Sequence, residues 1–421
     1  PTFPSLSRTR VCRGVYRDKV RPVLLNSWEA FYFDIHEEAC LSLAAQAADL
    51  GVELFVVDDG WFVKRNTDRA ALGDWREDRE KFPGGICSLA EKIREMGMGF
   101  GIWFEPEMVS PDSDLYRAHP DWIIRSSLYD PVLSRTQYVL DLSNPEVCDF
   151  IYQSVADILE KTKASYVKWD MNRHITDLGS AYLKEKCQRE LSHRYILGLY
   201  SILERLNRNF PEVLFEGCSS GGGRYDAGML YYMPQTWASD NTDAVCRLKI
   251  QYGTSILFPA ITMGSHVSDV PNHQVRRITP LSTRFAAAMS GNLGYELDLR
   301  KMSEEEKREV KEEIRFYKSI REVIQMGRFY RLKNPQRGNE AAWNFVSEDG
   351  RTVIYCYFRI LSDPLSLSFP VKLKGLDPDS VYRLEENGLC YGGDELMYAG
   401  ITSYPEKGDF SSHVYVFQKI K

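Results

Sequence analysis

The sequence has no excess of positive charge, because 53 Lys and Arg residues stand against 59 Asp and Glu residues and give a net charge of −6. A protein that binds nucleic acid needs clustered Lys and Arg to neutralise phosphates. The sequence also lacks any apolar run near the roughly 18 residues that a membrane span requires, and residues 1–20 hold no apolar stretch typical of a signal peptide. We therefore expect no nucleic-acid partner, no membrane partner and a cytoplasmic location.

Paired cysteines are missing as well. The nine cysteines are odd in number and scattered, with no CxxC pair and no Cys/His cluster at zinc spacing. This pattern predicts reduced, mostly buried thiols. His266 and His273 have no third histidine or carboxylate at ligand spacing, which favours structural hydrogen bonding over metal binding. The sequence therefore predicts neither a metal site nor a cofactor.

A regular alternation of short apolar runs and longer helix-period segments begins near residue 23. Apolar residues recur at three-and-four spacing in residues 36–50, 86–96, 145–162 and 190–209. The candidate strands between them are residues 23–28, 54–58, 99–104, 138–142, 166–170, 214–217, 235–239 and 258–262. This rhythm predicts an α/β fold, a (β/α)8 TIM barrel, whose chemistry lies on the loops at the strand C-termini. The doubly wound alternative needs a Gly-rich turn after its first strand, and Asn26-Ser27-Trp28-Glu29 is not one.

The pattern changes beyond the barrel. Residues 303–326 open with Ser303 and Glu306, which form a capping-box pattern, and continue as a long amphipathic helix that closes the barrel. Alternating runs follow at residues 352–358, 365–373 and 413–418, separated by Asp-Pro and Gly-Gly turns. We therefore predict a connecting segment at residues 1–22, the barrel at residues 23–332 and a small antiparallel β domain at residues 333–421.

Carboxylates and tryptophans gather at the ends of the candidate strands. They are Trp28, Asp58, Asp59, Trp61, Trp103, Glu105, Asp141, Trp169, Asp170, Asp240 and Asp243. A single Asp of this kind is readily explained as a helix cap, but acids beside aromatic residues at most of the strand ends are not. A pocket rich in acids and lined by indoles suits a neutral polyol, whose hydroxyls need acceptors and whose C–H faces need flat apolar partners. The expected partner is a small carbohydrate.

Three segments carry a resemblance to a known family. Residues 54–62 read LFVVDDGWF and are followed by Gly73-Asp74-Trp75, residues 166–173 read YVKWDMNR, and residues 216–226 read EGCSSGGGRYD and lead to WASDNTD at 237–243. With its motifs in this order, the sequence resembles the bacterial α-galactosidases of glycoside hydrolase family 36. The similarity runs from near residue 8 to the C-terminus and includes MGSHVSDVPNHQ at 263–274 and YGGDELM at 391–397.

The resemblance implies a retaining hydrolase that releases terminal α-linked galactose from oligosaccharides such as melibiose and raffinose. Asp170 takes the position of the family's nucleophile, and Asp240 takes that of its general acid and base. The family's sugar-binding residues fall on Trp28, Asp58, Asp59, Trp103, Arg135, Lys168, Asn172, Cys218 and Gly221. In the family, the pair that matches Asp58 and Asp59 binds O4 and O6 of the sugar.

Physical arguments agree with the catalytic pair. A retaining mechanism needs two carboxyl groups about 5 to 5.5 Å apart, and the predicted fifth and seventh strands, which carry Asp170 and Asp240, lie one strand apart. Lys168 lies on the same strand face as Asp170, so we expect its ammonium to keep the Asp170 carboxylate ionised and to bind a hydroxyl of the sugar. Asp240 must be protonated at rest, and the charge of Asp170 nearby would raise its pKa as required.

Backbone geometry constrains the sugar-binding residues. Asp58 and Asp59 cannot both point into a barrel from a regular strand, so we expect the chain to leave strand geometry there with the help of Gly60. The glycines at residues 221–223 lack the following Lys-Ser/Thr of a phosphate-binding loop. Cys218 has no neighbouring His in the sequence, which favours packing or a thiol contact with the sugar over a nucleophilic role.

The sequence departs from the family in one respect and leaves alternatives open. Family members usually carry a β-sandwich domain before the barrel, which helps to build the oligomer, whereas only residues 1–22 precede the first predicted strand here. A homo-oligomer is therefore one possible state of the protein.

The alternative functions are an α-N-acetylgalactosaminidase or a galactosyl transferase with the same catalytic pair, and a non-catalytic sugar-binding module. The presence of both Asp170 and Asp240 favours an enzyme.

Overall fold

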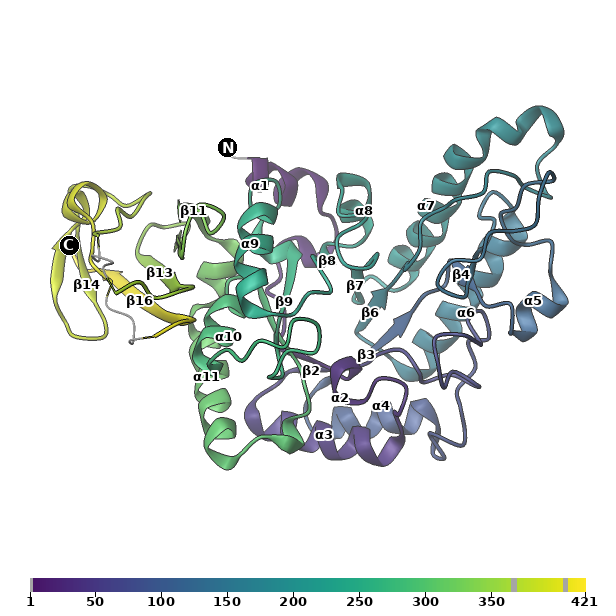
Figure 1. The fold of residues 1–421 in the computed structure, drawn as a ribbon, viewed down its shortest axis with the longest axis horizontal. Coiled ribbons are helices and arrows are strands. Elements are labelled where there is room, and N and C mark those ends of the chain that lie inside the picture. The colour runs from purple at the N-terminus through teal and green to yellow at the C-terminus, as the bar shows by residue number, and fades with distance from the viewer. Residues whose placement is uncertain (1–2, 365–368, 404–407) are drawn as a thin grey trace.

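The computed structural model describes residues 3–364, 369–403 and 408–421 (Figure 1). Its centre is a closed barrel of parallel strands, which are β1 (Leu24–Asn26), β2 (Leu54–Val57), β3 (Gly99–Phe104), β6 (Tyr166–Trp169), β7 (Leu214–Gly217), β8 (Gln235–Trp237), β9 (Met263–Ser268) and β10 (Asn292–Glu296). The strands follow one another around the barrel in sequence order, and β10 pairs with β1 to close it. The predicted (β/α)8 barrel is confirmed.

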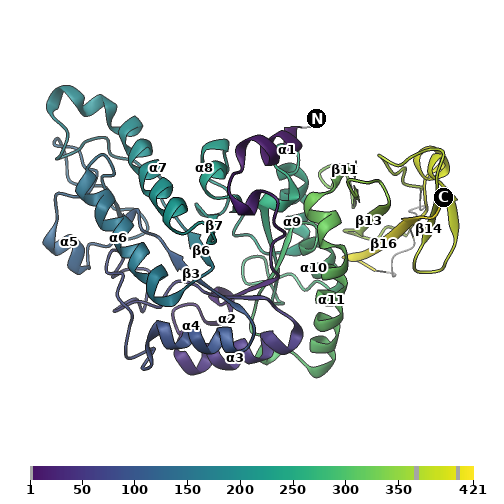
Figure 2. The same ribbon diagram turned by 180° about the vertical axis from the view of Figure 1, so that it is seen from behind.

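Helices surround this barrel (Figures 1 and 2). The longer ones are α3 (Glu37–Leu50), α4 (Gly85–Glu95), α6 (Pro145–Thr162), α7 (Leu191–Asn209), α9 (Ala244–Thr254), α10 (Leu281–Ala288) and α11 (Glu304–Met326), and the shorter ones are α1 (Phe3–Leu6), α2 (Trp28–Phe31), α5 (Asp114–Ala118) and α8 (Ala227–Tyr232). The four predicted helical segments correspond to α3, α4, α6 and α7. The predicted capping box is also present, because the side chains of Ser303 and Glu306 each bond the other residue's backbone N–H at the start of α11.

Two predicted strands are wrong, and two barrel strands, β9 and β10, lie outside the prediction. Residues 138–142 contain β5 (Tyr138–Val139), which pairs antiparallel with β4 (Met108–Val109) outside the barrel. Residues 258–262 end in a 3₁₀ turn, η4 (Ala260–Thr262), and β9 begins only after it. Short apolar runs resemble buried strands whether or not they pair in the barrel. The strand β10 has the sequence NLGYE, which is too polar and too rich in glycine to stand out as an apolar run.

The C-terminal part forms a six-stranded antiparallel sheet. Its strands, in spatial order, are β11 (Arg328–Lys333), β12 (Glu340–Val346), β13 (Thr352–Arg359), β16 (Ser411–Lys419), β14 (Val381–Leu384) and β15 (Cys390–Gly392). The predicted strands at 352–358 and 413–418 correspond to β13 and β16. In the predicted strand at 365–373, residues 365–368 lie outside the described residues, and Val371 forms only an isolated bridge with Ile401. The sheet begins with β11, before the expected domain boundary at residue 333.

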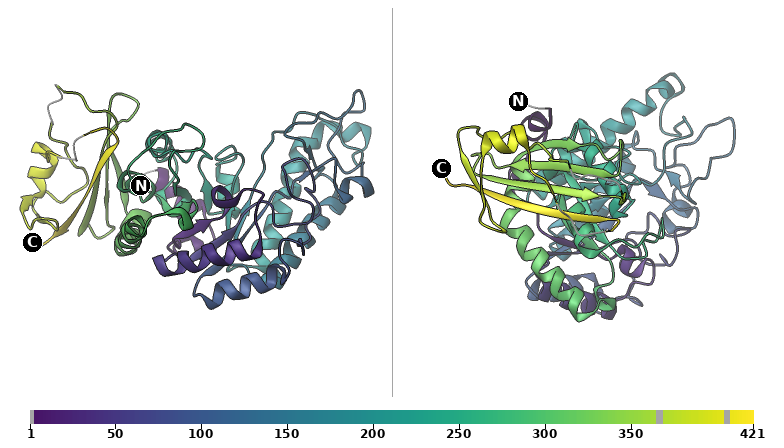
Figure 3. Two further views of the ribbon diagram at one scale, coloured as in Figure 1. Left: turned by 60° about the horizontal axis from the view of Figure 1, so that its bottom comes forward. Right: turned by 60° about the vertical axis from the view of Figure 1, so that its left-hand side comes forward.

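The sheet packs against the barrel on the side of α10 and α11, away from α6 and α7 (Figure 3). Trp343 of β12 donates from its indole N–H to Ser290 Oγ at 2.9 Å. Thr283 of α10 donates to the carbonyl oxygen of Phe410 at 2.7 Å. Buried side chains of β12 and β13 belong to the same apolar cluster as the barrel helices. The two parts therefore share one continuous core.

The N-terminal segment closes the other end of the barrel. Tyr16 packs in a small buried cluster with Leu24, Leu54, Tyr166 and Leu214, at the N-terminal ends of four barrel strands. Its hydroxyl donates to the carbonyl oxygen of Glu212 at 2.9 Å. A cavity lies at the opposite end of the barrel, where the strands finish. None of the helices in the described part of the chain combines the length and apolar character needed to cross a membrane.

Candidate active site

A cavity of about 260 Å³ lies at the C-terminal ends of the barrel strands. Pockets for drug-sized ligands have volumes of roughly 300–1,000 Å³, so this one suits a small ligand such as a single sugar ring. Of the site residues that the sequence predicts, those lining the cavity are Trp28, Asp58, Asp59, Trp103, Arg135, Lys168, Asp170, Asn172 and Asp240. Cys218 and Gly221 do not line it, although both contact the region around Asp240.

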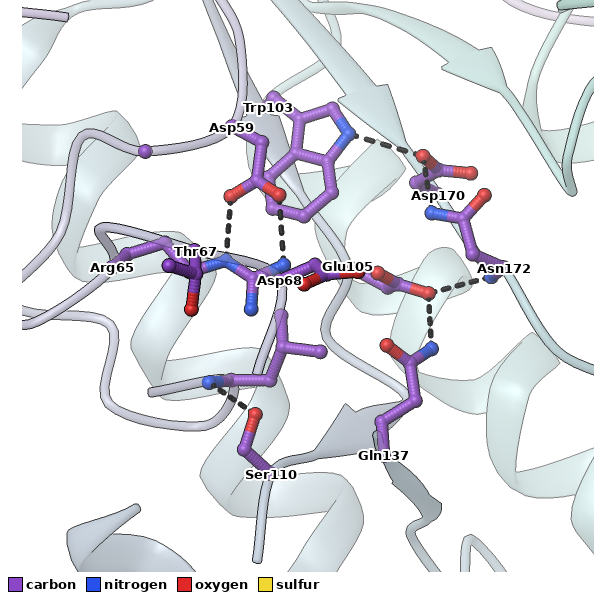
Figure 4. Close-up of polar contacts among 12 residues, drawn as sticks. Asp59, Arg65, Thr67, Asp68, Trp103, Glu105, Ser110, Gln137, Asp170 and Asn172 are labelled. Atoms are coloured by element: carbon purple, nitrogen blue, oxygen red, sulfur yellow. Dashed lines mark hydrogen bonds and ion pairs between the residues drawn. The ribbon is translucent and has the colours of Figure 1, made fainter. Parts of the chain in front are cut away.

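Asp170 follows β6 and is buried. Its Oδ1 accepts the backbone N–H of Met171 at 2.9 Å, and its Oδ2 accepts the indole N–H of Trp103 at 3.1 Å and the amide of Asn172 at 2.7 Å (Figure 4). These three donors come from the same loop and from the neighbouring strand β3. The carboxylate is therefore held in one orientation at the edge of the cavity.

Asp240 lies on the loop after β8, and the strand β7 separates β8 from β6. The predicted spacing of one strand between the two carboxyls is therefore present, although the strands are the fourth and sixth of the barrel and not the fifth and seventh. Burial, followed by the charge of Asp170, raises the pKa of Asp240 to about 6. This shift has the direction expected for a group that donates a proton.

Gly221 and Cys218 contact Asp240 and the neighbouring Ser239 outside the cavity lining. Gly221 has a φ of +84°, and a Cβ at this position would lie 2.6 Å from Ser239 Cα and 2.9 Å from Asp240 N. Only glycine allows so close an approach of the two loops. The thiol of Cys218 lies 3.8 Å from Asp240 Oδ1. Burial, with Asp170 and Asp240 nearby, raises the pKa of this thiol well above its usual value, which argues against a nucleophilic thiolate.

Lys168 forms its ion pair with Asp58 and not with Asp170, contrary to the sequence-based expectation. Lys168 Nζ lies 2.8 Å from Asp58 Oδ2, and both side chains are buried. The ammonium reaches Asp58 across β3, because side chains that point into a narrow barrel meet those of other strands. Burial alone lowers the pKa of Lys168, but the carboxylates of Asp58 and Glu296 outweigh it and hold the pKa well above its usual value.

Asp59 forms a two-point ion pair with Arg65. Arg65 Nε and Nη2 donate to the two carboxylate oxygens of Asp59 at 2.9 and 2.8 Å (Figure 4). The strand β2 ends at Val57 and Gly60 has a φ of +107°, so the chain leaves strand geometry where the sequence predicts it. Both Asp58 and Asp59 therefore reach the cavity, each with its own cation.

Two buried glutamates after β3 have no role in the sequence-based prediction. Glu105 lines the cavity, and its Oε1 accepts the backbone N–H of Asn172 at 2.5 Å and the side-chain amide of Gln137 at 2.7 Å. Glu107 forms a two-point ion pair with Arg224 at 3.0 and 2.8 Å. Because Arg224 also donates to Ser219 at 2.8 Å, this pair fixes the loop that carries Gly221. The sequence places Glu105 among the acids at the strand ends, but no sequence pattern indicates its contacts with Asn172 and Gln137.

Other polar residues singled out in the sequence are structural. Asp141 accepts hydrogen bonds from Ser143 and is absent from the cavity, and Asp243 caps α9 by accepting the N–H of Cys246 at 2.8 Å. His266 Nδ1 lies 2.9 Å from Glu296 Oε2, as expected of a structural histidine. His273, in contrast, lines the cavity, where its Nδ1 lies 3.4 Å from Glu29. Within residues 3–364, 369–403 and 408–421, no group of three or more His, Cys, Asp or Glu side chains is arranged to hold a metal ion.

Comparisons with known proteins find relatives along the whole chain. The melibiase family model matches residues 1–327, and the model of the glycosyl hydrolase family 36 C-terminal domain matches residues 340–417. The α-galactosidase AgaA of Geobacillus stearothermophilus is 51% identical over 420 residues, which are 100% of this chain and 58% of that protein. The α-galactosidase Mel36A of Lactobacillus acidophilus is 47% identical over 418 residues, which are 99% of this chain and 57% of that protein.

A solved structure is similar along the whole fold. The crystal structure of an AgaA variant in complex with raffinose has a TM-score of 0.98 and 51% sequence identity, and the match covers 99% of this chain and 58% of that chain. The present chain thus spans less than two thirds of the length of these relatives. The matches confirm the resemblance carried by the three sequence segments. Since the melibiase model covers well over half of its residues, the chain belongs to the melibiase family, within glycoside hydrolase family 36.

Proposed function

We propose that this chain hydrolyses terminal α-linked galactosides with retention of configuration, through a covalent galactosyl-enzyme. One observation carries the proposal: Asp170 and Asp240 line the same cavity in contrasting surroundings. Asp170 accepts three N–H donors, whereas the pKa of Asp240 is raised to about 6. Two carboxyl groups in unlike environments can divide the work of nucleophile and proton donor between them.

The reaction has two balanced steps. In the first, an oxygen of Asp170 attacks the anomeric carbon, the bond from that carbon to the leaving oxygen breaks, and Asp240 gives its proton to this oxygen. In the second, Asp240 takes a proton from water, the water oxygen attacks the same carbon, and the bond to Asp170 breaks. Each step inverts the carbon, so the product keeps the α configuration and both carboxyls return to their starting states.

The substrate-binding roles follow from the cavity. Asp58 and Asp59 supply charged acceptors for sugar hydroxyls, and their cations Lys168 and Arg65 hold them in place. Trp28 and Trp103 supply flat apolar surfaces for the C–H faces of the ring. Arg135 and Asn172 line the cavity beside Asp170, and Cys218 and Gly221 shape the loop next to Asp240.

Galactose is favoured over a 2-acetamido sugar on two grounds. The relatives AgaA and Mel36A are named α-galactosidases, and an AgaA variant was crystallised with raffinose. The small residue Gly221 makes room for the backbone of Ser239, not for a substituent of the sugar, since a Cβ there would meet Ser239 Cα at 2.6 Å. The space that an N-acetyl group needs is therefore not provided by this glycine.

The test is a turnover assay with an anomer readout. We expect the 421-residue chain to hydrolyse 4-nitrophenyl α-galactoside and raffinose, and to turn over the N-acetylgalactosamine counterpart of the aryl substrate much more slowly. Proton NMR during the first minutes should detect α-galactose before mutarotation. Initial release of β-galactose would exclude the double displacement, and faster turnover of the N-acetylated substrate would exclude the assignment to galactose.

A further inference from the structure

Glu105 lines the cavity but has no part in the proposed reaction. It follows β3, and only 2% of the residue is exposed. Its Oε1 accepts two hydrogen bonds, from the backbone N–H of Asn172 at 2.5 Å and from Gln137 Nε2 at 2.7 Å (Figure 4). A buried carboxyl group with such short contacts is held firmly, and in turn it holds its donors.

Asn172 connects Glu105 to the proposed nucleophile. Its side-chain amide donates to Asp170 Oδ2 at 2.7 Å, while its Oδ1 accepts the hydroxyl of Ser220 at 3.2 Å. The backbone of Asn172 therefore faces Glu105, and its side chain faces Asp170, as Figure 4 shows. Glu105 thus holds the backbone of Asn172 in place, and Ser220 holds its Oδ1, so that the amide N–H is directed at the carboxylate.

Glu105 can hold the backbone of Asn172 whether or not its carboxyl group is charged. Burial and the nearby charge of Asp170 raise the pKa of Glu105, so that a proton is retained more readily than on an ordinary glutamate. A protonated carboxyl still has a carbonyl oxygen that accepts two hydrogen bonds. The anchor for Asn172 therefore requires an oxygen at this position and not a negative charge.

From this chain of contacts, we propose that Glu105 is a positioning residue, which acts through Asn172 to fix the orientation of the Asp170 carboxylate for attack on the anomeric carbon. The proposal rests on the proposed function, because it assigns Asp170 as the nucleophile. It predicts that an acceptor oxygen at residue 105 controls the rate of bond formation to Asp170 and leaves substrate affinity nearly unchanged.

The main experiment compares Glu105→Ala with Glu105→Gln on 4-nitrophenyl α-galactoside. Glu105→Ala removes the acceptor, and a misplaced reacting group can cost about 10²-fold, so kcat should fall by about 10²-fold while KM changes little. Glu105→Gln keeps a carbonyl oxygen of the same reach and should retain kcat within about fivefold of the wild type. Such rescue by the conservative variant separates an acceptor role from a role of the charge.

Two controls separate positioning from simple loss of folding. Titration with 5-fluoro-α-galactosyl fluoride, whose covalent adduct on Asp170 is hydrolysed slowly, counts the molecules able to form the Asp170 bond, so kcat can be expressed per active site. Asp141→Ala is the matched control. Like Glu105→Ala, it removes a buried carboxylate that accepts hydrogen bonds, here from serine hydroxyls, but Asp141 lies outside the cavity. It should lower Tm as Glu105→Ala does and leave kcat per active site unchanged.

A double-mutant cycle tests the route through Asn172. In an Asn172→Ala background the amide contact with Asp170 is already absent, so Glu105→Ala should add less than about fivefold to the loss. Equal losses in both backgrounds would overturn the proposed route. The proposal would also be overturned by a wild-type kcat per active site in Glu105→Ala, or by a Glu105→Gln variant as slow as Glu105→Ala. Failure of the wild-type chain to release galactose would instead refute the proposed function itself.

Discussion

At the scale of single residues, Asp240 gives the clearest dependence on pH. Burial and Asp170 raise its pKa to about 6, and the proposed first step needs the protonated form. We therefore expect kcat/KM to fall as the pH rises through about 6. The contribution of this group to stability has the same sign: it is complete below the ordinary pKa of 3.8 and is lost as the pH rises through about 6.

The measurement is a profile of kcat/KM against pH for the wild type and for the slow residual activity of Asp240→Asn, on raffinose, whose sugar leaving group needs the proton. The descending limb should vanish in the variant, since the titrating group has been removed. Persistence of the limb in Asp240→Asn would assign it to another group and would remove Asp240 from the role of acid.

The two carboxylates can also be told apart by the product that azide forms. Asp170→Ala lacks the nucleophile, so azide enters the vacated space, displaces the leaving group directly and gives the inverted β-galactosyl azide. Asp240→Ala still forms the bond to Asp170 when the leaving group is activated, and azide then replaces water to give the α-galactosyl azide. NMR of the two products is the measurement, and the reverse assignment would mean that the roles are exchanged.

The ion pair between Asp58 and Lys168 makes a prediction about stability. Asp58→Asn leaves the Lys168 ammonium buried without its ion-pair partner and should cost about 3–5 kcal/mol of unfolding free energy. The double variant Asp58→Asn/Lys168→Met removes both charges and should recover most of this loss. Urea denaturation measures the stabilities. The value of kcat/KM should stay low in both the single and the double variant, because both side chains are proposed to bind the sugar. Wild-type activity in the double variant would argue that the pair is only structural.

The sequence predicts well those site residues that stand at strand ends, and less well their partners. Asp58, Asp170 and Asp240 each lie just after a barrel strand, where the fold places chemistry. The pairing of Lys168 with Asp58 joins residues 110 positions apart and depends on the width of the barrel, which no local pattern reveals. Glu105 was visible at its strand end, but its contact with Asn172 depends on how two loops meet.

At the scale of elements, the loop between β7 and α8 sets the position of Asp240. Gly221 packs against Ser239 with a φ of +84°, so Gly221→Ala adds both strain at a left-handed position and a clash at 2.6 Å. We expect kcat/KM to fall by about 10²-fold, because Asp240 follows Ser239 directly and is displaced with it. Steady-state kinetics at a pH below 6 is the measurement.

Gly97 offers a matched control for this variant. It has a φ of +86°, and a Cβ there would meet no atom within 4 Å. Gly97→Ala should therefore cost about 1–2 kcal/mol of stability from the left-handed backbone alone and leave kcat/KM unchanged. Equal losses of activity in the two variants would mean that strain, and not the contact with Ser239, explains the effect of Gly221→Ala.

The elements also show where sequence patterns stop being informative. The helices at residues 145–162 and 303–326 carry both periodicity and caps, and their predicted bounds match the structure closely. Residues 138–142 have the apolar character of a barrel strand, yet Tyr138 and Val139 pair with β4 outside the barrel. In the strand β10, Glu296 lines the cavity and Asn292 forms a buried hydrogen bond with Gln235. These polar residues have structural partners, but they also make the strand too polar to be recognised as an apolar run.

At the scale of the whole molecule, the barrel and the C-terminal sheet share a core, and this predicts that they unfold together. Trp343 is buried where the two meet, and its indole donates to Ser290 of the barrel at 2.9 Å. Trp343→Ala should cost about 3–5 kcal/mol, as large aromatic truncations in cores do. Because the lost contacts belong to both parts, calorimetry should record one transition at a lower Tm, with kcat per active site unchanged.

The control for this variant is Tyr398→Ala, which removes a tyrosine on the C-terminal domain that is 70% exposed. Its Tm should stay within about 2 °C of the wild-type value, since exposed substitutions change stability by about 0.5 kcal/mol or less. A Trp343→Ala protein that melts in two steps, with the sheet unfolding first and the active site surviving, would show that the shared core does not couple the domains. A single lowered transition instead makes the sheet a part of the stability of the barrel, and therefore of the frame that holds Asp170 and Asp240 one strand apart.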